Sequence, residues 1–244
     1  ALSGSQSLSL VDGINLLHLI FPKGRDSLSI QLSGGGCEHM GNFPTFPVKG
    51  KLKMSPDNIL NYRINVSEEK GHAGYYEAMV QEDIKAKLTV TERTGMASYE
   101  YPADQQYGTI IIGGGISATP IEQAAIVITA PNKCEGYAEG GNFCGLRTPY
   151  KVYFVAEFDT DAFETGTWKR EELMPNTTFA EGEYSGVYFT FDVNKKKNIQ
   201  YKIGVSYVSV ENARENLKAE NAEWDSKDTR IRRRQNGNHY LGYD

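Results

Sequence analysis

The chain has 244 residues, of which 39% are hydrophobic and 23% are charged, which is typical of a globular protein that buries one large core or two small ones. Its formal net charge of −5 argues against nucleic-acid binding, which needs basic surface to neutralise phosphates. No apolar run approaches the roughly 20 residues that a membrane-spanning helix needs. We therefore expect neither a nucleic acid nor a membrane as a partner.

The first predicted strand follows a segment, residues 1–26, that has no clear hydrophobic period. Residues 28–32 (LSIQL) alternate apolar and polar side chains, as a strand does. They lead into a glycine-rich run, SGGGCE at residues 33–38, where three successive glycines let a partner approach the backbone closely. A tight loop between strands is the alternative interpretation. Pro44 and Pro47 then exclude a central strand.

Residues 61–102 predict an antiparallel meander. Four segments rich in Tyr, Val, Ile and Thr are separated by turn residues: NYRINVS, GYYEAMV, IKAKLTVTE and TGMASYEYP. In the third segment Ile84, Ala86 and Leu88 alternate with polar residues, which indicates a half-buried strand. Glu92 and Arg93 come at its end, where a ligand contact and a local ion pair are both open.

Further strands are predicted at residues 107–115 (YGTIIIGGG, buried), 126–130, 149–159 (PYKVYFVAEFD) and 185–193. The polar excursion Ala162–Ala180, which contains Trp168, predicts a surface hairpin or loop. Three cysteines, Cys37, Cys134 and Cys144, are too few for a disulfide framework. A Cys134–Cys144 bridge and free buried thiols are both open, and no spacing indicates a metal site.

The segment CEGYAEGGNFCG, within residues 133–145, carries a candidate sugar platform. Tyr137 and Glu139 are flanked by glycines, and an aromatic ring can stack on a sugar while a carboxylate accepts hydrogen bonds from its hydroxyls. A β-turn with a packed tyrosine is the alternative.

The most organised stretch is IQYKIGVSYVSVENARENLKAENAEW, residues 199–224. Alternate residues from Ile199 to Ser209 share one face of a strand. Ser209 can then cap a helix, with Asn212 at its third position. Four residues at helical spacing follow: Val210, Ala213, Leu217 and Asn221. About a dozen strands with one terminal helix indicate an all-β fold, a large antiparallel β-sandwich with a C-terminal helix.

Several of these segments resemble glycoside hydrolase family 92, the exo-acting α-mannosidases. The similar segments are GVSYVSVENARENLKAENAEWD, AGYYEAMVQEDIKAKLTVTERTGMASYEYP, YKVYFVAEF, YAEGGNFCG, and LSGGGC followed by GNFP. They run from about residue 28 to residue 225. The histidines of the family's HTHLSG motif are missing, because Ser29, Ile30 and Gln31 precede Leu32. This departure weakens the transfer of binding roles.

The resemblance implies a galactose-mutarotase-like supersandwich over residues 27–225, preceded by an unassigned segment, 1–26, and followed by a tail, 226–244. In the family, calcium-dependent inverting hydrolysis of terminal α-mannosides takes place in an (α/α)6 domain that follows, and calcium is held mainly there. We therefore expect a sugar-contacting, non-catalytic N-terminal domain of an α-1,2-mannosidase, inactive alone and not holding calcium by itself. Its expected partners are α-mannoside glycans and the (α/α)6 catalytic domain, and its expected location is periplasmic or secreted.

The resemblance assigns no catalytic residue to this chain, so whether it has enzyme activity of its own stays open, as does whether it is a fragment or a free-standing protein. The alternatives are a stand-alone carbohydrate-binding module and a structural docking domain. The candidate sugar-binding residues are Ser33, Gly34, Gly35, Gly36, Cys37, Glu38, Asn42, Tyr137 and Glu139.

Overall fold

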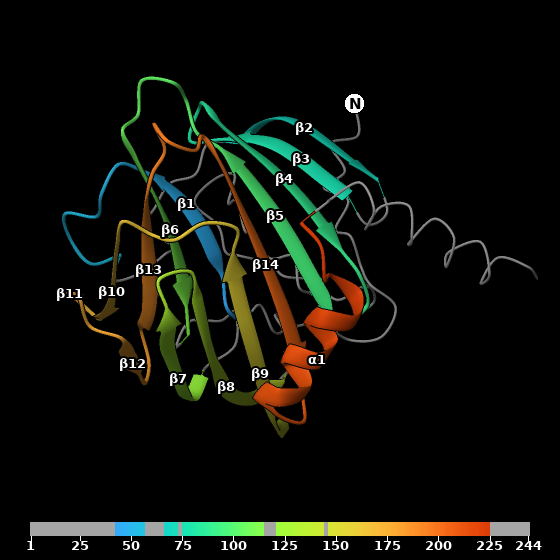
Figure 1. Ribbon diagram of the computed structural model, residues 1–244. Coiled ribbons are helices and arrows are strands. Elements are labelled where there is room, and N and C mark those ends of the chain that lie inside the picture. Colours follow the sequence, from blue (N-terminus) through green and yellow to red (C-terminus); the bar gives the residue numbers. More distant parts are fainter. Residues whose placement is uncertain (1–41, 57–65, 73–74, 115–120, 144–145, 225–244) are drawn as a thin grey trace, which may run out of the picture.

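The computed structural model describes residues 42–56, 66–72, 75–114, 121–143 and 146–224. They form two stacked antiparallel sheets and one helix (Figure 1), which confirms the predicted all-β sandwich with a C-terminal helix. The predicted strand at 28–32 and the glycine-rich run lie outside these residues. Among the described residues, no helix has the length and apolar character needed to cross a membrane.

The two sheets differ in size. The five-stranded sheet has the order β1 (Thr45–Lys49), β6 (Tyr107–Gly113), β13 (Ser185–Asp192), β10 (Glu164–Lys169) and β11 (Glu172–Pro175). The nine-stranded sheet has the order β12 (Phe179–Glu181), β7 (Ile121–Ala130), β8 (Lys133–Phe143), β9 (Leu146–Phe158), β14 (Asn198–Ser206), β5 (Thr94–Glu100), β4 (Ile84–Val90), β3 (Tyr75–Val80) and β2 (Val66–His72). Pro47 lies in β1 at a sheet edge, as its missing N–H requires.

The main core lies between the sheets and is rich in aromatic residues. Phe158 of the nine-stranded sheet has its ring centroid 4.7 Å from that of Phe189 and 5.1 Å from that of Phe191, both on β13. Alternate residues of β14, from Ile199 to Val205, enter the same core. The period-2 pattern therefore predicts the buried face correctly as far as Val205. β14 ends at Ser206, and Tyr207, which was expected on the same face, is exposed.

The five-stranded sheet is buried on both faces. Ile111 and Tyr188 point away from the core between the sheets, yet both are almost fully buried. Residues 50–56 cross this face: Lys51 pairs with Glu164 at 2.9 Å, and the Gly50 carbonyl accepts a hydrogen bond from Thr109. Burial on both faces explains why the strand at 107–113 reads as an apolar run instead of an alternating one.

The meander is confirmed, since β2, β3, β4 and β5 pair antiparallel in chain order. Its first strand differs from the prediction: β2 continues to His72 through polar residues expected in a turn. An edge strand is held by backbone hydrogen bonds to its one neighbour, so it does not require apolar side chains.

Residues 162–180 do form a hairpin, β10–β11, but Trp168 within it is fully buried. A polar sequence around one tryptophan gives no hint of that burial. Cys134, at the start of β8, has a free thiol. The thiol is buried, in line with the free-thiol alternative for this residue. Cys144 lies outside the described residues.

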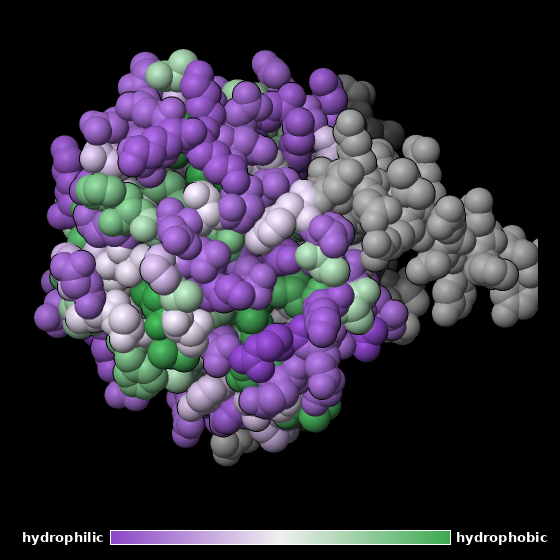
Figure 2. Space-filling view, viewed as in Figure 1, coloured by the Kyte–Doolittle hydropathy of each residue, from purple (hydrophilic) through white to green (hydrophobic). Residues whose placement is uncertain are grey.

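Helix α1 (Val210–Glu220) follows β14 after a short corner and lies on the face of the nine-stranded sheet that points away from the core, here called the outer face (Figure 1). The Ser209 hydroxyl accepts a hydrogen bond from the Asn212 amide at 3.1 Å, which confirms the predicted N-cap. Ala213 and Leu217 are buried against Val155. In the same view, Figure 2 shows a mainly hydrophilic surface whose hydrophobic residues form separate groups.

Candidate functional site

Tyr137 and Glu139 lie on the outer face of the nine-stranded sheet. Both belong to β8, whose intervening residue Ala138 points into the core. β8 is a continuous strand from Lys133 to Phe143, so the alternative of a β-turn around Tyr137 is wrong. The glycines on either side of these residues extend the strand, and at Gly136 they allow close packing: an added Cβ would lie 2.0 Å from the Ala125 carbonyl oxygen.

The neighbouring strand β9 supplies partners for both residues. Tyr137 is opposite Tyr153, and Glu139 is opposite Lys151. The two tyrosine rings have centroids 6.2 Å apart at an interplanar angle of 52°. We call Tyr137, Glu139, Lys151 and Tyr153 the outer-face cluster. Its members are half-buried, so each keeps part of its surface accessible to a ligand.

Lys151 links the cluster. Its ammonium pairs with the Glu139 carboxylate and lies 3.7 Å from the centroid of the Tyr137 ring and 5.5 Å from that of Tyr153. The hydrogen bond to Glu139 raises the pKa of Lys151 above its usual value. The ammonium is therefore charged at neutral pH, where it holds the carboxylate and the Tyr137 ring together.

The cluster continues along the same face as a series of ion pairs. Glu135 pairs with Arg214 of helix α1 at 2.7 Å, and Lys133 pairs with Glu157 at 3.1 Å. Each described carboxylate of the β8–β9 outer face thus has a cationic partner within 4 Å. This arrangement offers aromatic rings, hydrogen-bond donors and hydrogen-bond acceptors, which suits the recognition of hydroxylated ligands.

Asn42 lies apart from this cluster. Its amide nitrogen is 3.1 Å from the Tyr150 hydroxyl. Tyr150 is the residue before Lys151 on β9, so its side chain projects from the opposite face, where it packs against the main core. The structure therefore brings Tyr137 and Glu139 together and places Asn42 on the other side of the same strand pair.

The remaining predicted site residues, Ser33, Gly34, Gly35, Gly36, Cys37 and Glu38, lie outside the described residues. Within the part of the chain that the structure describes, no group of three or more His, Cys, Asp or Glu side chains could hold a metal ion. Arg93 pairs with Glu220 of helix α1 at 2.6 Å, so its observed partner is distant in the sequence and the expected local ion pair is not the one that forms.

Sequence reasoning missed Lys151, Tyr153 and Arg214. A signal for the first two was present, because PYKVYFVAEFD places Lys151, Tyr153, Val155 and Glu157 on one face by simple alternation. The sequence did not show that this face adjoins Tyr137, since that depends on the β8–β9 register. Arg214 joins through the packing of α1 on the sheet, which no local pattern encodes.

Solved structures share this fold. The family GH92 inverting mannosidase BT2199 from Bacteroides thetaiotaomicron VPI-5482 has a TM-score of 0.70 and 24% identity, over 83% of this chain and 27% of that chain. The gh92 family glycosyl hydrolase ccman5 has a TM-score of 0.72 and 22% identity, over 88% of this chain and 29% of that chain. The family GH92 α-mannosidase BT3965 from Bacteroides thetaiotaomicron has a TM-score of 0.66 and 23% identity, over 79% of this chain and 27% of that chain.

The chain thus spans less than a third of the length of these three structures, and the similarity to them is one of fold. No curated protein matches the chain in sequence. The family model described as the glycosyl hydrolase family 92 N-terminal domain matches residues 28–206, which is most of the chain and confirms the resemblance. The chain therefore belongs to the glycosyl hydrolase family 92 N-terminal domain family.

Proposed function

We propose that this chain is the sugar-contacting, non-catalytic N-terminal domain of an α-1,2-mannosidase and is inactive alone. The observation that carries the proposal is the outer-face cluster within a family 92 N-terminal domain. Its rings can pack on the apolar face of a sugar, while Glu139 accepts and Lys151 donates hydrogen bonds to hydroxyl groups. The cluster's role is to bind and orient an α-mannoside, and proton transfer belongs to a following (α/α)6 domain.

Calcium and location are further parts of the proposal. Sugar binding by this chain is proposed to need no calcium. We assign the calcium to the full-length enzyme. A glycan-binding role places the protein in the periplasm or outside the cell, where complex mannosides are met. The glycine-rich run and Asn42 remain proposed sugar contacts.

Calorimetric titration of the purified chain with mannose and α-1,2-mannobiose, with calcium present, tests the proposal alongside a hydrolysis assay on the same sample. Binding without turnover is the expected result. Neither binding nor turnover would mean that this chain holds at most half of a site completed by another domain. Turnover by the chain alone would contradict a non-catalytic role.

Tyr137→Ala is the variant that tests the cluster. Loss of the ring should weaken mannoside binding about tenfold, which corresponds to about 1.4 kcal/mol, and should change the free energy of unfolding by about 1 kcal/mol or less because Tyr137 is half-buried. The matched control is Tyr75→Ala. Tyr75 lies near a glutamate and a lysine at another place on the same sheet, since its hydroxyl donates to Glu77, which pairs with Lys85.

The control should leave sugar affinity unchanged. If Tyr137→Ala lowers stability as much as affinity, the ring is a packing element and the cluster is not a binding surface. If both variants weaken binding equally, recognition is nonspecific.

A further inference from the structure

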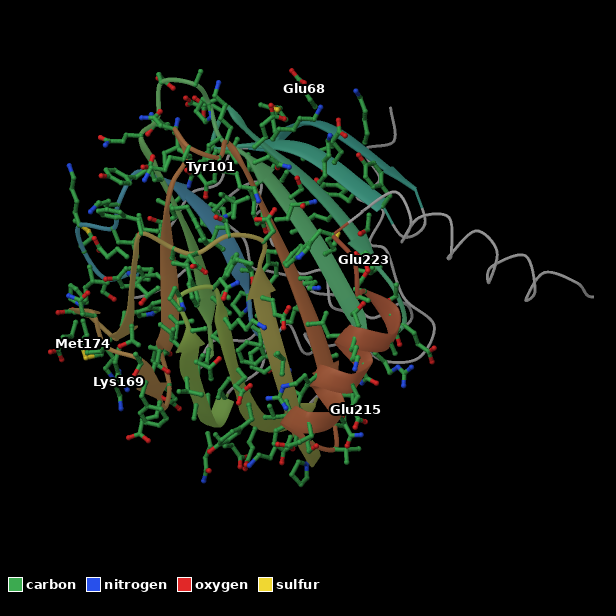
Figure 3. All side chains as sticks on the ribbon, viewed as in Figure 1. Glu68, Tyr101, Lys169, Met174, Glu215 and Glu223 are labelled. Atoms are coloured by element: carbon green, nitrogen blue, oxygen red, sulfur yellow. The ribbon has the colours of Figure 1, made fainter. Side chains whose placement is uncertain are left out.

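The chain that leaves helix α1 is held on the outer face by more than apolar packing. The apolar contact itself is small: only Ala213, Leu217 and Val155 are buried in it, with Val210 at its side. A helix of 11 residues is marginal in isolation. Yet the chain from Glu220 to Trp224 returns over the sheet alongside β14 (Figure 3, where Glu215 and Glu223 mark the helix and the segment after it).

The first attachment is Glu220, the last residue of α1. Its carboxylate accepts hydrogen bonds from the Thr91 hydroxyl at 2.5 Å, the Arg93 amide at 3.0 Å and the Arg93 Nε at 2.6 Å. The next residue, Asn221, donates from its side-chain amide to the Thr94 hydroxyl. The β4–β5 turn, residues 91–94, is thus bound to the helix end through four polar groups of its own.

The second attachment is Lys202 on β14, which is 5% exposed. Its ammonium donates to the carbonyl oxygens of Asn221 and Ala222, both at 3.1 Å, and lies 4.3 Å from the centroid of the Trp224 ring. Gln200, two residues earlier, donates to the Trp224 carbonyl at 3.0 Å. A cation beside carbonyls at a helix C-terminus complements the helix dipole.

Burying a lysine at this position carries a desolvation penalty. Burial lowers the pKa of Lys202, which shows that its charged form is disfavoured by desolvation. An apolar side chain of similar length would fill the space under Trp224 without that cost. The ammonium also pairs with the Glu157 carboxylate at 3.8 Å, but its two hydrogen bonds go to the carbonyls of residues 221 and 222. Lys202 therefore specifies where the backbone of these two residues lies.

We propose that the β4–β5 turn and Lys202 form a two-point latch that fixes the path of residues 220–224 over the outer face. The latch holds Glu220–Trp224 on the outer face, beside the strands that carry the outer-face cluster. It is local: its release frees the end of α1 and leaves the two sheets folded. The proposal does not depend on sugar binding.

Hydrogen–deuterium exchange on Lys202→Met and Glu220→Gln tests the latch. Lys202→Met removes the ammonium and with it the second attachment. Glu220→Gln removes the charge and one of the two acceptor oxygens of the first attachment. Backbone amides 217–221, including that of Asn221, which bonds to the Leu217 carbonyl at 2.9 Å, should exchange about tenfold faster in either variant. Amides of β6 and β13, in the other sheet, should be unchanged.

Arg214→Met is the matched control. It removes the ion pair to Glu135 from the middle of the same helix and leaves both attachment points intact, so exchange at amides 217–221 should stay as in the unaltered chain. Unchanged exchange in Lys202→Met and Glu220→Gln would overturn the proposal. Equal acceleration throughout both sheets would overturn it as well, because these residues would then belong to the global fold.

The fluorescence of Trp224 gives a second, independent measurement of the latch. It needs only the Glu220→Gln variant, so it remains possible if Lys202→Met folds poorly. The chain has two tryptophans, and Trp168 is fully buried. Acrylamide quenching of the intrinsic fluorescence therefore reports mainly on Trp224. The accessible fraction should become more easily quenched in Glu220→Gln, while Trp168 stays protected. Identical quenching of the variant and the unaltered chain would contradict a latch.

Discussion

Thr109 of β6 and Thr190 of β13 are opposite each other, fully buried, with their hydroxyl oxygens 2.9 Å apart. The Thr109 hydroxyl donates to the Gly50 carbonyl at 2.7 Å. A hydroxyl has one proton, so Thr190 is the donor to Thr109. This short chain of hydrogen bonds connects residue 50 to two strands of the five-stranded sheet. Thr109 makes two of these hydrogen bonds and Thr190 makes one, so the two threonines should contribute differently to stability.

Thr109→Val should lower the free energy of unfolding by about 1–3 kcal/mol, because it leaves the Gly50 carbonyl without this donor and the Thr190 hydroxyl without this acceptor. Thr190→Val should cost about 1 kcal/mol or less, since Thr109 keeps its bond to Gly50. Denaturant unfolding of both variants measures the difference. Equal losses would contradict the assignment of Thr190 as the donor to Thr109.

At the scale of elements, the contact between α1 and β14 depends on a residue without a side chain. A Cβ at Gly204 would lie 2.4 Å from the Ala213 carbonyl oxygen and 2.8 Å from the Leu217 Cβ. The helix therefore rests directly on the strand backbone, which brings Arg214, Glu220 and the segment after the helix within reach of their partners on the sheet.

Gly204→Ala should push α1 away from the sheet and cost about 1–3 kcal/mol, as overpacking of a close contact does. The control is Gly71→Ala on the edge strand β2, where the nearest atoms to an added Cβ are 3.5 Å away. Thermal unfolding followed by circular dichroism compares the two variants. A Gly204→Ala protein as stable as Gly71→Ala would mean that the helix shifts at no cost.

At the scale of the whole molecule, the core of the sandwich buries several phenols in their neutral form. Burial raises the pKa of Tyr99, Tyr101 and Tyr201 above the ordinary value of 10.0. Tyr101 donates to the Thr109 carbonyl, whereas the Tyr99 hydroxyl has no hydrogen-bond partner among the described residues. In the unfolded chain all three would ionise near their ordinary pKa.

The sandwich should therefore lose stability as the pH rises above about 10. The unfolded state releases protons that the folded state retains, so the free energy of unfolding falls by up to about 1.4 kcal/mol per pH unit for each phenol. Well below pH 10 the three phenols do not make the free energy of unfolding depend on pH, because they are protonated in both the folded and the unfolded state. Thermal unfolding between pH 9 and pH 11 measures the loss.

Tyr99→Phe is the variant that isolates one of these phenols. It removes one ionisable group and one unpaired hydroxyl. The free energy of unfolding should therefore fall less steeply with pH above pH 10, and stability at pH 8 should not decrease. A stability profile that is flat above pH 10 would contradict the prediction.

The sequence by itself determined the elements whose two faces differ. Alternation from Ile199 to Ser209 predicted the core face of β14, and Ser209 with Leu217 predicted the cap and the buried stripe of α1. Segment resemblance predicted the family, and the number of short strands predicted a sandwich. These features are local, because each depends on the spacing of residues within one element.

Only the tertiary structure decided which segments meet. Tyr137 and Glu139 were candidates from their own segment, but Lys151 and Tyr153 joined them through strand register. Asn42 was separated from them because it contacts the opposite face of the same strands. Trp168 was buried in a polar hairpin because the five-stranded sheet is covered on both sides. Glu220 and Arg93, 127 residues apart, form an ion pair because α1 folds back over the sheet, and a single sequence has no period that encodes such a contact.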